Sequence, residues 1–307
     1  MTIFLTLLGK IVPLYFSIVL GLLSTLVFKC HKDTIAKILL YLLAPLIVFN
    51  ATLSVKLDAS VLFLPLFFFL LSTILAFSLL YIFKKIWHDN TANLLAFSTA
   101  TGNTGNIGIP LAILFLEPHL VHVFIFTVLA SILYQNSVGY YITAKGDFSA
   151  RESIKKVLRL PVIYAFILGI IFNLLGLKLP EVFASYATYL KGAYSIFGMM
   201  LLGMGMEHVH RNKLIDFKFI SIALSIKFLL WPGIILGYIF LDKHYWHFLN
   251  DGFYMIMFLF SIVPLAGNTV TIATLLDVKP EKMSVAVLIS TLISLVYIPF
   301  ALYLYTR

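Results

Sequence analysis

The stretch STATGNTGNIGIPLAILFLE, Ser98–Glu117, decides the fold because it places helix-breaking residues inside an otherwise apolar segment. Each glycine weakens a helix interior by about 1 kcal/mol relative to alanine, and Pro110 removes a backbone donor. Unpaired backbone groups cost several kcal/mol apiece in a bilayer, so an interruption is tolerated only inside protein or beside an aqueous cavity. The stretch therefore predicts a broken helix that builds a site.

The composition predicts that the broken segment lies in a membrane. Of the 307 residues, 61% are hydrophobic and 11% are charged, whereas soluble domains carry about 25% charged residues. A bilayer span needs about 20 mostly apolar residues. Ten such runs fill nearly the whole chain: 4–28, 35–54, 61–83, 91–116, 119–143, 160–177, 183–206, 217–241, 251–277 and 283–305. An all-α integral membrane protein with ten transmembrane helices is predicted, and its fourth and ninth helices carry polar interruptions.

The basic charge predicts topology. The formal charge is +9, and 15 of the 22 Lys and Arg residues fall in loops on one side of the predicted membrane against 4 on the other. The positive-inside rule places the richer loops in the cytoplasm and both termini outside a plasma membrane. No nucleic-acid partner is expected, and the start of the chain lacks the basic region and cleavage pattern of a removable signal peptide.

Two internal matches indicate a duplication. PLYFSIVLGLL at Pro13–Leu23 resembles PVIYAFILGII at Pro161–Ile171, and GNTGNIG at Gly102–Gly108 resembles GNTVTIA at Gly267–Ala273. The second match joins the predicted fourth and ninth helices. Five spans in each half give the second half the opposite orientation.

The duplication predicts two inverted repeats, residues 1–147 and 158–307, within a single transporter unit. The basic segment Lys145–Arg159 is the expected linker. Inverted repeats with helix breaks at equivalent positions are typical of secondary transporters whose site lies near the bilayer midplane.

Both breaks are expected to start a second half-helix near the midplane. Asn103 and Asn106 precede a predicted half-helix at Ile107–Phe115, whereas Asn268 and Thr269 precede one that ends at Leu276. Asparagine and threonine are common N-caps, and the positive end of a helix suits a carboxylate. The alternative is a helix kink without function.

The predicted substrate-binding residues are the polar and glycine positions of both breaks together with polar residues of nearby spans. They are Gly102, Asn103, Gly105, Asn106, Gly267, Asn268, Thr269, Thr271, Asn50, Gln135, Asn136 and Lys227. Pro110 and Pro264 are expected to shape the crossover. Interhelical hydrogen bonding is the alternative for Asn50, Gln135 and Asn136.

Lys227 falls near the centre of the eighth span, where a charge costs about 2.5–3.5 kcal/mol on insertion scales. Either it faces the substrate path or it bonds to carbonyls of a broken helix. Glu117, Glu207 and Asp251 fall at span edges, which disfavours a proton/sodium antiporter. A coupling ion, proton or sodium, is left open.

Metal, cofactor and enzymatic chemistry are not expected. EHVHR at Glu207–Arg211 and HYWH at His244–His247 lack three or four convergent zinc ligands, and Cys30 is the single cysteine. No nucleotide loop or nucleophile elbow is present.

With ten predicted spans, GNTGNIGIPLA at Gly102–Ala112 and KFLLWP at Lys227–Pro232, the chain resembles the auxin efflux carrier family. The resemblance implies a dimerising scaffold, residues 1–56 plus 160–210, and a mobile transport unit, residues 60–145 plus 215–305. It places the crossover at Asn103, Asn106, Pro264 and Asn268, with Asn50, Gln135 and Asn136 in the cavity. Bile-acid sodium symporters share a related crossover fold.

The resemblance also implies a function. Similar bacterial proteins transport malate, malonate and other organic acids, and plant relatives export auxin. The chain is expected to move a small organic anion, such as malate, malonate or an auxin-like acid, by an elevator mechanism, as a homodimer in the bilayer. The alternatives are a sodium-coupled organic-anion symporter on the same scaffold, a solute sensor that does not transport, and a membrane-embedded enzyme.

Overall fold

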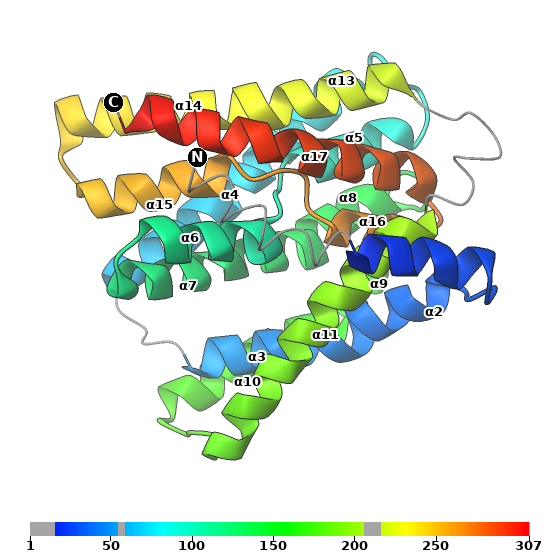
Figure 1. Ribbon diagram of the computed structural model, residues 1–307, viewed down its shortest axis with the longest axis horizontal. Helices are drawn as coiled ribbons and strands as arrows, with labels where there is room; N and C mark the ends of the chain where they lie inside the picture. The colour runs from blue at the N-terminus through cyan, green and yellow to red at the C-terminus, as the bar shows by residue number, and fades with distance from the viewer. Residues whose placement is uncertain (1–15, 55–58, 206–215, 307) are drawn as a thin grey trace.

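The computed structural model describes residues 16–54, 59–205 and 216–306, and this part of the chain is helical without strands (Figure 1). Its helices form two groups. The helices α2, α3, α10 and α11 lie together below the others in Figure 1, and the remaining long helices form a block above them. The predicted all-helical fold is confirmed for the described residues.

The described residues of the first half contain one unlabelled helix and seven α-helices interspersed with π-helical turns. In order they are Phe16–Leu26, α2 (Lys32–Lys37), η1 (Ile38–Leu43), α3 (Ala44–Ser54), α4 (Ala59–Phe83), α5 (Thr91–Thr99), η2 (Thr104–Gly108), α6 (Ile109–Phe115), α7 (Pro118–Tyr134), η3 (Gln135–Gly139) and α8 (Tyr140–Ala144). Both α2–α3 and α7–α8 run on through their π-helical turns without a gap.

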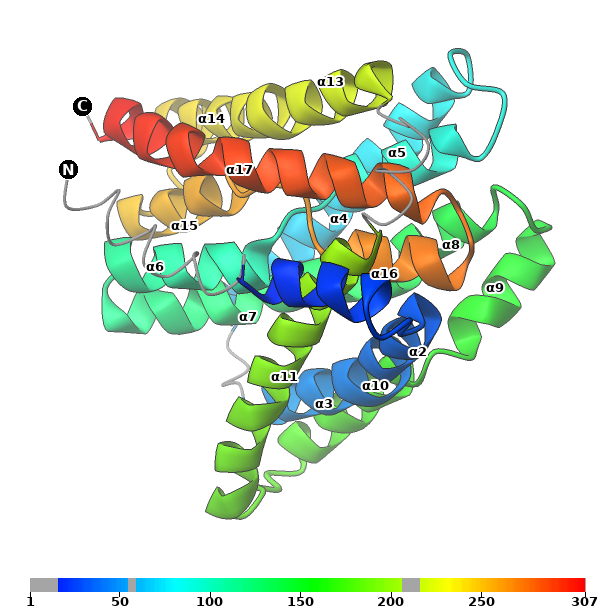
Figure 2. The same cartoon turned by 45° about the vertical axis from the view of Figure 1, so that its right-hand side comes forward.

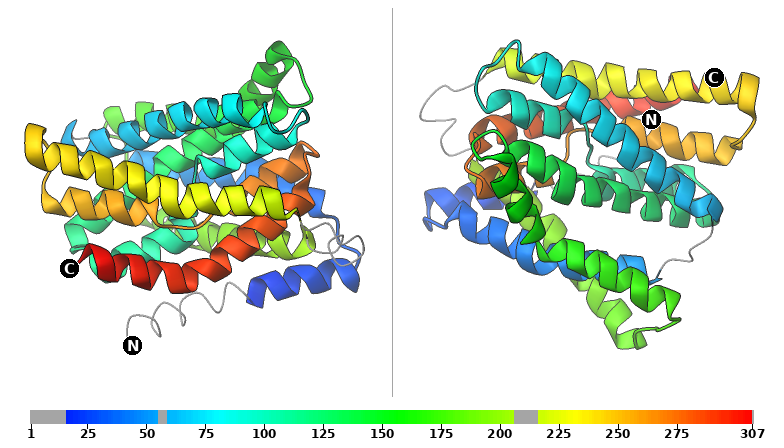
Figure 3. Two further views of the ribbon diagram at one scale, coloured as in Figure 1. Left: turned by 90° about the horizontal axis from the view of Figure 1, so that it is seen from above. Right: turned by 180° about the vertical axis from the view of Figure 1, so that it is seen from behind.

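The second half begins with a short amphipathic helix. The elements are α9 (Ala150–Leu158), α10 (Pro161–Leu174), α11 (Glu181–Gly205), α13 (Phe217–Ser225), η4 (Ile226–Leu230), α14 (Trp231–Leu241), η5 (Asp242–Trp246), α15 (Asp251–Ser261), α16 (Asn268–Leu275) and α17 (Pro280–Tyr305). Seen from above and from behind, α13 and α14 form one long rod that runs alongside α15 and α17 (Figure 3).

Several helices are long and apolar enough to cross a membrane. Within the part of the chain that the structure describes, five qualify as continuous segments: Lys32–Leu53, Leu62–Phe83, His119–Ala144, Phe217–Trp246 and Pro280–Tyr305. A sixth is obtained when α9 and α10, which meet at 52°, are counted as one bent span. Since an apolar helix of this length spans the hydrocarbon core, the chain is a multi-pass membrane protein.

Local chemistry accounts for the helix ends that differ from the predicted ones. The tenth span starts at Pro280 rather than 283, since proline is favoured in the first helical turn. The sixth ends at Leu174 rather than 177, because Gly176 takes a left-handed φ of 70° after it. The eighth runs past 241 through η5.

Small residues let the lower helices touch. A Cβ built on Gly21 would lie 1.9 Å from the carbonyl oxygen of Met200, and one on Gly203 would lie 1.9 Å from that of Ile18. Backbones this close require glycine, so Phe16–Leu26 packs tightly on α11. Asn173 on α10 donates to the carbonyl oxygens of Thr52 and Leu53 at the end of α3, 3.0 and 2.9 Å away.

The two groups meet at α16. This short helix packs against α2 and α11 of the lower group as well as against α5, α8 and α17 of the upper one (Figure 2). The residues at its N-terminus therefore face both groups.

Candidate functional site

The first break separates α5 from η2. Residues 100–103 are not helical, and the Oδ1 atom of Asn103 caps the following turn by accepting from the Asn106 N–H at 3.3 Å. The predicted cap at Asn103 is confirmed. The second half-helix begins at Thr104 in π-helical form rather than at Ile107, so the expectation that Asn106 precedes it is wrong: Asn106 lies inside η2.

The second break separates α15 from α16. Residues 262–267 are not helical, and α16 begins at Asn268. The expectation that Asn268 and Thr269 precede this half-helix is therefore wrong. Gly267 is the N-cap and, as a glycine, has no side chain that could cap the helix, while the Asn268 amide is engaged by other helices. The Thr269 hydroxyl donates locally to the carbonyl of Ala266 at 2.5 Å.

The two breaks meet through the main chain. The Asn103 N–H donates to the carbonyl oxygen of Pro264 at 2.8 Å, and the Leu265 N–H donates to Oγ of Ser290 on α17 at 3.2 Å. Each bond satisfies a backbone group that leaving the helix had freed. Two segments more than 150 positions apart in the sequence therefore form one junction.

Side chains connect the breaks a second time. The Asn268 Nδ2 donates to Oε1 of Gln135 at 3.0 Å, and the Gln135 Nε2 donates to Oγ1 of Thr101 at 2.8 Å. The Tyr194 hydroxyl on α11 donates to Oδ1 of Asn268 at 3.0 Å. The structure thus brings together the predicted residues Asn268, Gln135 and Asn103, and it adds Thr101 and Tyr194, which the sequence analysis missed.

Lys227 lies against the first break. Its side chain is 1% exposed, and a Cβ built on Gly102 would lie 2.7 Å from its Nζ atom. The ammonium stands 4.7 Å from the ring centroid of Trp231, whose Nε1 donates to the Thr99 carbonyl at 2.7 Å. Within residues 16–54, 59–205 and 216–306, Lys227 has no hydrogen bond or ion pair. The alternative that it bonds to carbonyls of a broken helix is therefore wrong.

A neighbouring donor is also unpaired. The Asn103 Nδ2 is buried without an acceptor in the described part of the chain. A buried lysine nitrogen and a buried amide donor cost free energy unless an acceptor meets them. The first break therefore has an excess of donors, which suits an anion.

The other predicted residues contribute less. Gly105 and Gly267 have open space where a Cβ would project. Asn136 bonds to the Ile132 carbonyl of its own helix at 2.7 Å, and its Oδ1 is buried without a donor in the described residues. In the same part of the chain, no hydrogen bond joins the side chains of Asn50, on α3, or Thr271, on α16, to either break.

The two prolines differ in place. Pro264 lies within the non-helical segment of its break, whereas Pro110 is in the first turn of α6. Since η2 runs into α6 without a gap, Pro110 lies inside the second half-helix, where it removes one backbone donor. The glycines and Asn103 before it make the break.

An ion pair joins the end of α16 to the start of α5. Lys279, which follows α16, bonds to Asp89 and Thr91 at the start of α5. Partial burial opposes ionisation of Asp89, but hydrogen bonds from Lys279 and Thr91 outweigh it and lower the pKa of Asp89 to about 2. The carboxylate thus stays charged and holds the two elements together.

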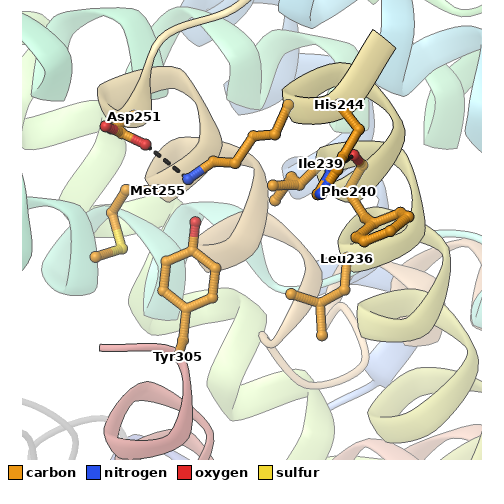
Figure 4. A pocket seen from close by; sticks show the side chains of 8 residues that line it. Leu236, Ile239, Phe240, His244, Asp251, Met255 and Tyr305 are labelled. Atoms are coloured by element: carbon orange, nitrogen blue, oxygen red, sulfur yellow. Dashed lines mark hydrogen bonds and ion pairs between the residues drawn. The ribbon is translucent and has the colours of Figure 1, made fainter. Parts of the chain in front are cut away.

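A separate cavity of about 450 Å³ lies between α14, α15 and the end of α17 (Figure 4). Its charged groups already neutralise one another, since the Lys243 Nζ lies 2.8 Å from Oδ1 of Asp251. Nearby Asp242, which the sequence analysis missed, is buried and accepts from the Tyr254 hydroxyl at 2.7 Å and the Leu249 N–H at 2.9 Å. These paired groups offer an anion less than Lys227 does.

The histidine motifs give no metal site in the described residues. No group of three His, Cys, Asp or Glu side chains suited to a metal occurs there. The Nδ1 atom of His244 lies 2.8 Å from the Phe240 carbonyl. His208 and His210 lie outside the described residues.

Comparison with known proteins identifies the family of the chain. Curated proteins give no match to the chain. The family described as "Membrane transport protein" matches residues 6–302, which is nearly the whole sequence. Its members are transporters rather than enzymes. The chain belongs to this membrane transport protein family, the auxin efflux carrier family.

Proposed function

We propose that the protein is a secondary transporter that moves a small organic anion, a carboxylate such as malate, malonate or an auxin-like acid, across the plasma membrane. The observation that carries this proposal is the buried Lys227, whose Nζ lies against Gly102, together with the buried Nδ2 of the following residue, Asn103; neither has a hydrogen-bond partner in the described residues. A carboxylate offers acceptors to both groups and neutralises a charge that is expensive to bury alone.

We further propose that ten helical segments cross the bilayer as two inverted repeats, with both termini outside and α5–α6 and α15–α16 as the crossover. The lower helices would form a scaffold that pairs with a second copy, and the upper block would carry the site in an elevator motion. The separation of the two groups in Figures 1 and 2 supports this division. The two bonded breaks support a site that moves as one unit.

Proteoliposome uptake tests the proposal. Purified protein is reconstituted, and uptake of radiolabelled malate, malonate and an indole carboxylate is compared with empty vesicles. Asn103→Ala and Asn268→Ala should each lower uptake of the transported acid at least tenfold, since each removes polar groups of the junction. Carboxylate flux that is unchanged in both variants would reject the site.

The position of Lys227 also bears on coupling. A fixed ammonium against Gly102 disfavours a sodium ion at the first break, because like charges repel strongly where the dielectric is low. We therefore expect uptake at constant voltage and pH to be unaffected by a sodium gradient. A steep dependence on the gradient would favour the sodium-coupled symporter instead.

A further inference from the structure

Tyr194 stands out because it belongs to one helix group and bonds to the site in the other. It lies on α11 of the lower group and is half-buried, and its hydroxyl donates to Oδ1 of Asn268, the first residue of α16, at 3.0 Å. The same Asn268 amide donates to Gln135 and so connects to Thr101 of the first break. A single hydroxyl thus links the lower group to both breaks.

We infer that Tyr194 tethers the empty carrier in this conformation and that substrate binding at Asn268 releases it. The inference rests on the proposed function, since an elevator motion shifts the upper block relative to α11. Any bond between the two must then break before the site can move. Tyr194 is therefore a positioning residue that decides when the carrier moves.

The geometry of the amide explains the release. Asn268 uses Oδ1 toward Tyr194 and Nδ2 toward Gln135. A carboxylate that takes the Nδ2 donor pulls the amide toward itself, and because Oδ1 is fixed to the same planar group, Oδ1 leaves Tyr194. The exchange gives up two neutral hydrogen bonds, to Tyr194 and Gln135, for one to a charged acceptor, which is about twice as strong as a neutral bond, so the release costs little free energy at Asn268.

Another bond crosses the same boundary but is a weaker tether. Lys32 on α2 lies 2.8 Å from Glu281 on α17, with the two side chains 27% and 23% exposed. Water and salt screen such pairs, and many contribute nothing measurable. This pair therefore serves better as a reporter of the conformation than as its cause.

Cross-linking of the empty carrier tests the tether without any substrate. In a Cys30→Ser background, Lys32→Cys and Glu281→Cys are joined by a short flexible bismaleimide in reconstituted protein. Adding Tyr194→Phe should slow cross-linking about two- to tenfold, which is the population effect of one neutral hydrogen bond. Tyr189→Phe is the matched control, since it removes a hydroxyl from the same helix at a side chain that is 74% exposed.

Transport assays give a second readout, which a purely structural role of Tyr194 would not change. Net uptake of radiolabelled malate requires the empty carrier to return, whereas exchange with malate inside the vesicle does not. Tyr194→Phe should raise the ratio of net uptake to exchange about two- to tenfold, and Tyr189→Phe should leave it unchanged.

The outcomes separate the two proposals. Slowed cross-linking in Tyr194→Phe supports the tether even where malate is not carried, because that measurement involves no flux. Cross-linking equal to that of Tyr189→Phe overturns it. Where malate is carried, equal changes in net uptake and exchange overturn it as well. Absence of carboxylate flux from the unmodified protein counts against the proposed function alone.

Discussion

The two breaks share the letters Gly-Asn-Thr but use them differently. In the first, Asn103 caps its own half-helix, its Nδ2 has no acceptor in the described residues, and the preceding Gly102 lies against a buried lysine. In the second, Asn268 caps nothing and spends both ends of its amide on other helices. The first break is therefore capped by its own side chain and presents hydrogen-bond donors. The second is held by side chains of other helices and connects the junction to them.

The largest effect should come from removing the charge at the first break. Lys227→Met keeps the length of the side chain but deletes the cation, and losing one partner of a buried charge interaction costs about 2–5 kcal/mol. Carboxylate uptake should fall at least 30-fold. The empty protein should melt at a higher temperature, because an unpaired buried charge is gone.

Lys218→Met is the control for that variant, since Lys218 also lies over a tryptophan ring, 5.0 Å from Trp87, but is exposed. It should change neither uptake nor melting temperature appreciably. Equal uptake by Lys227→Met and Lys218→Met would show that the charge of Lys227 plays no part in transport.

Matched glycine substitutions separate the two breaks next. A Cβ at Gly102 would meet the Lys227 Nζ and Val263 Cγ2 at 2.7 Å, whereas one at Gly267 meets nothing within 4 Å. Gly102→Ala should destabilise by about 1–3 kcal/mol through overpacking and lower uptake. Gly267 has a helical φ of −58°, which alanine adopts without strain, so Gly267→Ala should be neutral or slightly stabilising. Thermal melting in detergent measures both, and equal losses would contradict the difference in packing.

A conservative change tests whether the cap and the donor at Asn103 are separable. Aspartate caps a helix about as well as asparagine, so Asn103→Asp should keep stability within about 0.5 kcal/mol. It exchanges the Nδ2 donor for a carboxylate oxygen that repels an anion, so uptake should fall about tenfold. Asn103→Ala should lose uptake and about 1 kcal/mol of stability together. Normal uptake by Asn103→Asp would show that Nδ2 does not meet the substrate.

The smallest effect concerns the ion pair that joins the ends of the broken elements. Because the pKa of Asp89 is lowered from 3.8 to about 2, its contribution to stability is complete above about pH 4 and is lost as the pH falls toward 2. Asp89→Asn should melt slightly below the unmodified protein at pH 6, and the difference should vanish near pH 2. A difference that grows on acidification would contradict the assignment.

Local residue chemistry predicted much of the helical fold and the place of both breaks. Apolar runs predict membrane helices because the bilayer leaves backbone groups no partner but one another. The glycines at 102–108 and the cap at Asn103 mark the first break for the same reason. Gly-Asn-Thr at 267–269 marks the second, although there the asparagine lies one residue inside the helix.

Contacts between distant segments could not be predicted in this way. Tyr194 sits in an ordinary apolar helix, and only the packing of α11 on α16 gives its hydroxyl a partner. Thr101 and Trp231 gain their roles similarly, by bonding to Gln135 and to the Thr99 carbonyl. Lys227 was recognised as unusual from its position in an apolar span, but its neighbour Gly102 became visible only in three dimensions.

The bond from the Asn103 amide nitrogen to the Pro264 oxygen uses atoms that almost every amino acid possesses. No exchange of side chains at position 103 other than to proline can delete it. If the proposed function holds, substitutions at Gly105, Asn106 or Asn268 should change solute preference while the joint between the two halves survives. Engineering a new cargo should begin with those three positions.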